Sequence, residues 1–323
     1  MFRTKIDINT NFPEINYNSN IFFFGSCFTE NIGNIFVNSG FTTKINPFGI
    51  MYNPASIYKN IRILIDNKEF TDNDLDFYNN LWFSYNHHSK FSNLNKNVCL
   101  KNINDGITQS IKHLKKTDFI FFTFGTAWVY KLIKKNEIVA NCHKQPNNKF
   151  NRYRLTIKEI TDLYNNLINS LKAINSDIKI IFTVSPVRHL KDGANENQLS
   201  KSTLLLAIDN ILKNNKNTYY FPSYELIIDE LRDYRFYNDD MIHISNIAIN
   251  YIWDKIKDTF FTPKTKQICS QINKINKASN HKPFNEESND YQIFLQQNIK
   301  KINIIEKEYE INLQYLKQKF IKS

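Results

Sequence analysis

The sequence predicts an α/β protein: a three-layer α/β/α sandwich with a parallel sheet, plus an insertion and a C-terminal helical appendage. Short apolar runs alternate with segments of helical spacing, which is typical of a parallel sheet covered by helices on both faces. The longest runs are apolar at almost every position, as expected for strands buried on both faces. A chain of 323 residues, 41% of them apolar, can bury such a core.

The first elements are a strand over residues 21–24 (IFFF) and a helix over 28–38, where apolar side chains recur every three or four residues. A second strand over 41–46 follows. Pro54 favours the start of a helix over 55–65, because proline fits the first helical turn. The chain therefore opens with two strand–helix units.

Residues 67–108 do not fit this alternation and are interpreted as an insertion. A helix is expected over 107–116. The stretch 118–125 (DFIFFTFG) is the clearest buried strand of the chain, and residues 128–142 are expected to form a hairpin around the sequence KKNE. The sheet therefore continues after the insertion.

The second half of the domain repeats the pattern. Thr156 and Glu159 have the spacing of a capping box, which starts a helix that reaches about residue 174. A buried strand over 177–186 ends at a proline. The remaining elements are helices over 200–214, 223–231 and 245–260 and a short strand over 219–221.

The domain boundary is expected near residue 262. Residues 1–262 form the α/β domain, and a polar linker rich in Lys and Asn begins at residue 263. From Tyr291 onward, apolar side chains recur at steps of three and four residues, which predicts one long amphipathic helix. This helix either packs on its own domain or joins copies of the chain into an oligomer.

The formal net charge of +11 raises nucleic acid and anionic membranes as partners. The basic residues are dispersed, however, and the sequence has no motif of a nucleic-acid-binding fold, so no nucleic-acid partner is expected. The four cysteines form no CxxC pair, which argues against a zinc site and fits a reducing compartment. Without an apolar signal or spanning segment, a cytoplasmic protein with no membrane span is expected.

Small residues lie where three of the predicted strands end, at positions 25–26, 125–126 and 185–186. Because the carboxyl ends of parallel strands meet at one edge of a sheet, these positions should share the edge where ligands bind. A hydroxyl at this edge, that of Ser26, is therefore a candidate nucleophile.

A serine hydroxyl acts as a nucleophile only with a base and a group that orients the base. Asp240 and His243, three residues apart before the last helix of the domain, are candidates for this pair. Asp239 is a competing candidate for the acid. The thiol of Cys27 is a further nucleophile, but no separate base for it is evident.

Several stretches together resemble the GSCFA family, which is named for a motif close to residues 25–28 (GSCF). The others are NPFGIMYNP, FFTFGTAWVY, ANCHK, SPVRHLKDG with NQLSK, and LRDYRFYNDDMIHIS, and the resemblance covers about residues 15–262. The family looks like a branch of the SGNH (GDSL-type) hydrolases, which implies a flavodoxin-like, SGNH-hydrolase-like fold. The last position of the name motif is Thr29 in this chain in place of Ala.

The resemblance implies roles for single residues. Ser26 matches the nucleophile of the superfamily's first block, and Asp240 and His243 match the D-x-x-H of its last block. Gly49 and Gly125 match positions whose backbone N–H groups, with that of Ser26, form the oxyanion hole.

One position departs from the superfamily's pattern. The usual side-chain donor, an asparagine, is replaced by Ala127, and loss of one such donor costs about 10²–10³ in rate. Asn141 and His143, in the hairpin that leaves the same strand end, are candidates to replace it. His88 and Arg188 are further candidates for substrate contacts, because the guanidinium of Arg188 suits a carboxylate or phosphate. All four also suit structural roles.

The expected function is ester hydrolysis through a Ser-His-Asp triad, on an acyl or acetyl ester of a small molecule or glycan, with no metal and no cofactor. The alternatives are an O-acyltransferase that acts on a polysaccharide and a non-catalytic ligand-binding module. The missing asparagine favours the binding module, whereas the presence of Ser26, Asp240 and His243 favours the enzyme.

Overall fold

A computed structural model gives the structure of the chain and describes residues 4–8, 11–281 and 283–321. Its central sheet has five strands, all parallel, in the order β10–β9–β5–β1–β2. These are β1 (Asn20–Gly25), β2 (Thr42–Ile45), β5 (Phe119–Phe124), β9 (Lys179–Val184) and β10 (Thr218–Tyr220). The five predicted strands are confirmed, and with them the predicted fold class.

The order of the strands alone indicates where in the fold a ligand binds. Strand β1 has β2 on one side and β5 on the other, so the chain reverses its direction of winding between β1 and β5. Gly25 at the end of β1 is in register with Thr123 of β5. In open α/β sheets, ligands bind beyond the carboxyl ends of the strands at this reversal point. Ser26 lies directly after it.

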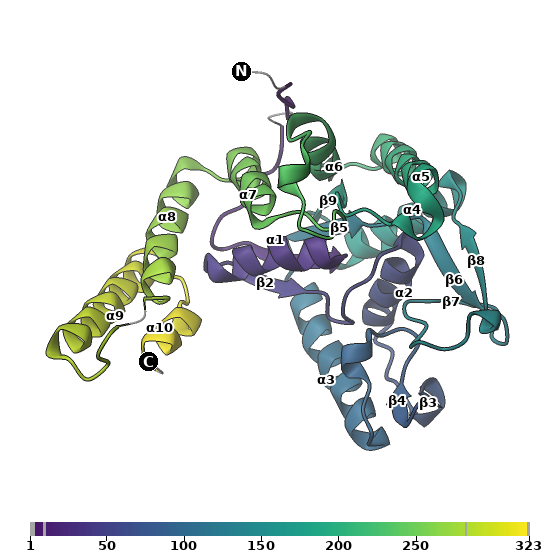
Figure 1. Cartoon of the computed structure of the whole chain (residues 1–323), viewed down its shortest axis with the longest axis horizontal. Coiled ribbons are helices and arrows are strands. Elements are labelled where there is room, and N and C mark those ends of the chain that lie inside the picture. Colours follow the sequence, from purple (N-terminus) through teal and green to yellow (C-terminus); the bar gives the residue numbers. More distant parts are fainter. Residues whose placement is uncertain (1–3, 9–10, 282, 322–323) are drawn as a thin grey trace.

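Helices cover both faces of the sheet (Figure 1). Alternate side chains of a strand point to opposite faces, so Phe23 and Phe121 pack in one core and Phe22 and Phe122 in the other. The first core includes the helices α1 (Cys27–Asn38) and α7 (Asn246–Phe260), and the second includes α2 (Pro54–Ile65), α4 (Ile157–Ile174) and α5 (Gly193–Asn214). The three-layer arrangement follows.

The expected insertion is shorter than predicted. It contains a small hairpin of β3 (Asp76–Tyr78) and β4 (Leu81–Phe83), and it ends at α3 (Lys96–Leu114). The prediction that helix began at residue 107 was wrong by eleven residues. The Asn95 side chain caps α3 by accepting from two backbone N–H groups, whereas Gly106 within the helix hides its continuity in the sequence.

The expected hairpin is β6 (Trp128–Leu132) with β7 (Glu137–Val139), and a third strand, β8 (Phe150–Arg154), pairs antiparallel with β6. Strand β8 was not predicted, because its sequence FNRYR carries too few apolar residues to stand out. Helix α5 also begins before residue 200, and α6 (Ser223–Glu225) continues as a π-helical turn over Leu226–Glu230.

The C-terminal region differs from its prediction. The expected linker is instead helix α8 (Pro263–Ala278), and the expected single helix is two, α9 (Asn289–Tyr309) and α10 (Gln314–Ile321). The chain breaks between them at Glu310, which has a left-handed backbone with φ of 54°. The three helices share an apolar core of their own and stand off the α/β domain (Figure 1). The hydroxyl of Tyr315 in α10 donates to the Asn38 carbonyl at 2.8 Å, which ties them to α1.

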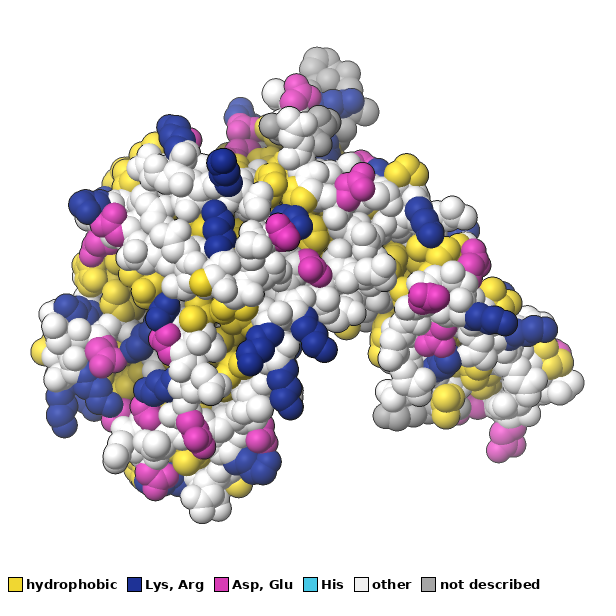
Figure 2. Space-filling view, turned by 180° about the vertical axis from the view of Figure 1, so that it is seen from behind, with side chains coloured by type: hydrophobic (Ala, Val, Ile, Leu, Met, Phe, Trp, Pro, Cys, Tyr) yellow, Lys and Arg dark blue, Asp and Glu magenta, His cyan; other side chains and the backbone are white. Residues whose placement is uncertain are grey.

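The positive charge is spread over the surface. On the face drawn in Figure 2, Lys and Arg side chains are scattered, with Asp and Glu side chains among them. Of the helices in the described ranges, none combines the length and apolarity needed to cross a bilayer.

Candidate active site

Ser26 lies at the junction of β1 and α1, and the glycine before it allows the backbone to pass close to the neighbouring strand. Gly25 has a φ of +153°, and a Cβ atom there would lie 2.4 Å from the carbonyl oxygen of Thr123 in the neighbouring strand. Only glycine tolerates so close an approach of two backbones. The chain can therefore turn sharply from the sheet into the helix and leave Ser26 as the N-cap residue of α1.

The Ser26 hydroxyl makes no hydrogen bond that would stabilise the turn into α1. Its side chain is 0% exposed, it makes no cap hydrogen bond to α1, and its Oγ has no partner in the described part of the chain. Burying a hydroxyl without a hydrogen bond costs free energy. The hydroxyl is therefore available to a base or a substrate.

Asp240 and His243 form a hydrogen-bonded pair in the loop before α7. Their side chains are joined by a 2.6 Å contact between Asp240 Oδ2 and His243 Nδ1. The other carboxylate oxygen accepts from the backbone N–H groups of Ile242 and His243, each at 2.9 Å. These hydrogen bonds, first of all that to the His243 ring, lower the pKa of Asp240 to about 2. No hydrogen bond joins Asp239 to His243, so the structure favours Asp240 as the acid.

Ser26 and His243 lie at the same edge of the sheet. Helices α1 and α7 pack together, with the rings of Phe36 and Trp253 4.9 Å apart. The backbone N–H of Arg188, just beyond the end of β9, donates to the Ile242 carbonyl, which places the loop of His243 at the carboxyl end of the strands. Ile244, next to His243, packs in the same core as Phe28.

The triad is not assembled in this structure. Within the described residues, no hydrogen bond joins the Ser26 hydroxyl to His243, whose side chain is 50% exposed. The carboxylate–imidazole half is thus preformed and open to solvent, while the hydroxyl is enclosed. A substrate reaches Ser26 only when the side chains around it move.

His189 is a site residue that the sequence interpretation missed. Its ring packs edge-on against Tyr52, and a Cβ atom on Gly125 would lie 3.1 Å from its Nε2. That Nε2 is buried and has no hydrogen-bond partner among the described residues. Burial, followed by the charges of Lys201 and His243, lowers the pKa of His189 to about 3, so the ring stays neutral. The only signal in the sequence was its place in SPVRH, directly after Arg188.

Two of the three expected oxyanion amides are occupied. The Gly49 N–H donates to the Asn46 carbonyl, and the Gly125 N–H donates to the Tyr52 carbonyl, both at 2.8 Å. Gly49 has a φ of +87°, and a Cβ atom there would lie 2.2 Å from His88 Cβ. These glycines therefore allow two histidines to pack closely.

A cavity of about 480 Å³ opens at this edge of the sheet. Of the expected substrate residues, His88, Asn141 and Arg188 line it, together with Tyr52 and His189. His143 does not: it stacks on Phe83 and bonds the Ser84 carbonyl, which is a structural role. Ser26 and His243 do not line the cavity either.

Tyr52 and His189 connect the cavity to the candidate triad. The backbone N–H of Met51, next to Tyr52, donates to the Gly25 carbonyl at 2.9 Å, which places this wall beside the residue before Ser26. Burial, and after it the neighbouring Cys27 and Glu30, raise the pKa of Tyr52. The charge of His243 likewise contributes to lowering the pKa of His189. Burial also raises the pKa of the Cys27 thiol, so the thiolate that a cysteine nucleophile needs is disfavoured.

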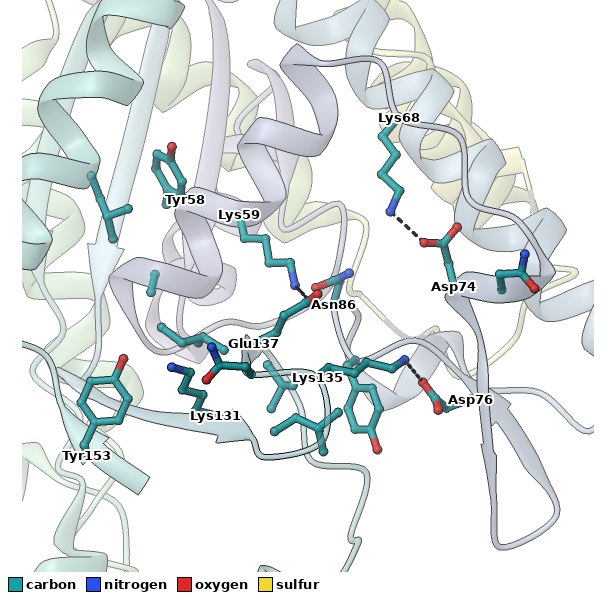
Figure 3. A pocket seen from close by; sticks show the side chains of 18 residues that line it. Tyr58, Lys59, Lys68, Asp74, Asp76, Asn86, Lys131, Lys135, Glu137 and Tyr153 are labelled. Atoms are coloured by element: carbon teal, nitrogen blue, oxygen red, sulfur yellow. Dashed lines mark hydrogen bonds and ion pairs between the residues drawn. The ribbon is translucent and has the colours of Figure 1, made fainter. Parts of the chain in front are cut away.

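A larger cavity, of about 660 Å³, lies between α2, the insertion and the β6–β7 hairpin (Figure 3). Its charged side chains are joined in ion pairs, such as Lys59 with Glu137 and Lys68 with Asp74. No group of three or more His, Cys, Asp or Glu side chains that could hold a metal occurs in the described ranges.

Lys201 links the ends of β5 and β9 through hydrogen bonds. It is 1% exposed, and its Nζ donates to the carbonyl oxygens of Gly125 and Ser185, each at 2.6 Å. Ala127, the position of the missing asparagine, is 0% exposed, so its side chain is part of the core. The only signal for this lysine in the sequence was its place at the end of NQLSK, one of the stretches that resemble the family.

We expect Lys201→Met to lower the free energy of unfolding by about 2–4 kcal/mol, because two buried carbonyls lose their donor. Burial lowers the pKa of Lys201 to about 7, whereas a lysine in the unfolded chain titrates near 10.4. Between these values the unfolded state binds the extra proton, so the contribution of Lys201 to stability rises with pH.

Urea denaturation at pH 6.5 and pH 9 measures this contribution. The stability gap between wild type and the variant should widen at the higher pH. A gap that is equal at both pH values would contradict the assigned pKa.

A family model described as the GSCFA family matches residues 20–256. The chain belongs to the GSCFA family. A second model, described as the C-terminal domain of GSCFA domain proteins, matches residues 272–322. In this GSCFA protein the first match runs from β1 into α7, and the second begins within α8 and covers α9 and α10. No curated protein matches the chain.

Proposed function

We propose that this GSCFA protein is a serine ester hydrolase of the SGNH type, with Ser26 as nucleophile, His243 as base and Asp240 as the orienting acid. One observation carries the proposal: a buried serine hydroxyl without a partner begins the helix at the reversal point of the sheet. The hydrogen-bonded Asp240–His243 pair lies at the same edge.

The geometry of the pair supports a general base. The Asp240 carboxylate accepts from Nδ1 of His243, which leaves the lone pair on Nε2 free to take a proton. When Ser26 Oγ attacks an acyl carbonyl, its proton passes to Nε2 and is then given to the leaving alcohol. Water, activated by the same imidazole, attacks the acyl-serine and releases the acid, which restores Ser26.

The oxyanion formed on attack needs donors. The N-terminus of α1, where Ser26 is the N-cap residue, supplies the first, because the first turn of a helix presents unpaired N–H groups and favours negative charge. The neutral ring of His189 is our candidate for the second donor, in place of the asparagine that Ala127 cannot provide. Its buried Nε2 has no other partner.

We expect His189→Ala to lower kcat by about 10²-fold, the typical effect of losing one oxyanion donor. His189→Asn restores an N–H donor and should recover part of the rate, whereas His189→Leu should not. Steady-state kinetics on a 4-nitrophenyl ester measure this order. Equal rates for the Asn and Leu variants would show that the ring acts only through packing.

Reaction with a fluorophosphonate probe tests the proposed enzyme class. An activated serine reacts with the probe, so wild type should be labelled and should lose 4-nitrophenyl acetate hydrolysis as labelling proceeds. A wild type that neither labels nor hydrolyses would favour the non-catalytic binding module, which the alanine at position 127 also favours. Product analysis with a carbohydrate acceptor present would reveal the O-acyltransferase, through acyl groups on the sugar in place of free acid.

A further inference from the structure

The 480 Å³ cavity beside the candidate triad has an unusual set of charges. Three cationic side chains line it, Arg152, Arg188 and Lys191, and its described lining contains no Asp or Glu. Arg152 forms an ion pair with Asp192, which neutralises it. Arg188 and Lys191 have no carboxylate partner in the described ranges. The cavity therefore carries two uncompensated positive charges.

The surroundings hold both cations in place. The guanidinium of Arg188 lies 4.3 Å from the ring centre of Tyr237, and Lys191 donates to the hydroxyl of Tyr130. Neither contact removes the positive charge. Arginine suits planar, two-point contact with an oxyanion, and lysine adds a point charge. Such a pair is suited to a carboxylate or a phosphate.

The basic composition of the chain does not by itself explain this cluster. The larger cavity in Figure 3 also contains lysines, but Lys59, Lys68 and Lys135 are each joined to an acidic side chain. In that cavity three of the four lysines are neutralised, and Lys131 has no ion pair in the described ranges. Of these two cavities, as lined by the described residues, only the one at the edge of the sheet has two unpaired cations and no acid.

The cationic cavity is also linked to the triad loop. The backbone N–H of Arg188 donates to the carbonyl of Ile242 at 3.2 Å, one residue before His243. An anion bound by Arg188 therefore lies beside the loop that carries the base. Tyr52 and Trp128 also line the cavity, and their rings provide an aromatic surface for the uncharged part of a ligand.

We propose that the ester hydrolysed by this protein is anionic, with a carboxylate or phosphate group bound by Arg188 and Lys191. The proposal rests on the proposed hydrolase function and adds the class of its substrate. The two cations hold the charged end in the cavity while the ester bond reaches Ser26.

Two esters with the same leaving group test the preference. We expect kcat/KM for 4-nitrophenyl hemisuccinate, which is anionic, to exceed that for the neutral 4-nitrophenyl butyrate by about tenfold or more at low salt. Arg188→Met and Lys191→Met should each lower this ratio about tenfold. Lys131→Met, which removes a lysine without an ion pair from the other cavity, is the matched control and should leave the ratio unchanged. A ratio near one, or a ratio insensitive to both cavity variants, would overturn the proposal.

Binding to the Ser26→Ala protein separates this proposal from the hydrolase. Calorimetry with succinate and with inorganic phosphate should give saturable binding of at least one anion, about tenfold weaker in Ser26→Ala/Arg188→Met, and the anion that binds identifies the group. Binding of neither overturns the proposed substrate class. Anion binding without hydrolysis of either ester would retain the anion site and reject the hydrolase. Ser26-dependent hydrolysis without a preference for the anionic ester would retain the hydrolase and reject the anion site.

Discussion

Ser26→Ala should lose ester hydrolysis by about 10³-fold or more without losing stability. The loss of rate follows from removing the nucleophile of a triad. Stability should be unchanged or higher, by up to about 1 kcal/mol, because the hydroxyl is buried without a hydrogen bond and its removal ends that cost. A serine that merely fills the turn would give no change in rate.

Ser110→Ala is a matched control for this experiment. Ser110 is also 0% exposed, but its hydroxyl donates to the Gly106 carbonyl at 2.6 Å within α3. This variant should lose about 1 kcal/mol of stability and keep its rate. Urea denaturation and initial-rate measurements should therefore show a loss of rate without a loss of stability for Ser26→Ala, and the reverse for Ser110→Ala. A Ser26→Ala protein that is less stable and equally active would reject Ser26 as nucleophile.

Asp240→Asn has the second largest expected effect, a fall in kcat of about 10³–10⁴-fold. The amide keeps an oxygen for the backbone N–H groups of Ile242 and His243, so the loop should stay folded. It no longer stabilises a protonated imidazole, and it can hold the ring in the wrong tautomer. Asp239→Asn is the control, since no hydrogen bond joins that residue to His243, and it should keep the wild-type rate. The opposite order would make Asp239 the acid.

The pH dependence of the same pair has a defined sign. The pKa of Asp240 is lowered to about 2 by its hydrogen bonds to His243 and the backbone, below the ordinary value of 3.8. The carboxylate therefore stabilises the folded loop above pH 4, and this contribution is lost as the pH falls toward 2. Asp240→Asn should remove that acid-dependent part of the stability, as followed by acid denaturation.

The sheet and the pair Asp240–His243 were predictable because their signals are local. A short apolar run such as IFFF, which ends at a glycine, is typical of a buried strand, and the D-x-x-H spacing lets two side chains of one turn meet. The helix α8 was missed because its apolar residues, Ile268, Ile272 and Ile275, lie in a stretch otherwise rich in Lys, Asn and Gln. Its burial depends on α9 and α10, which the local pattern does not show.

The rest of the site depends on contacts between distant segments. His189 matters because it packs on Gly125 and Tyr52, which come from two other strand ends. The occupied amides of Gly49 and Gly125 follow from turns whose hydrogen bonds have no signature in the sequence. The cationic cavity likewise combines Arg188 and Lys191 with the aromatic wall of β6.

Mapping the fluorophosphonate adduct by peptide mass spectrometry tests the central claim most directly. We predict that wild type carries a single adduct on Ser26 and that His243→Ala carries none, because only the imidazole can take the proton of the hydroxyl. An adduct on Cys27 or on another serine, or modification of Ser26 that persists without His243, would contradict the account.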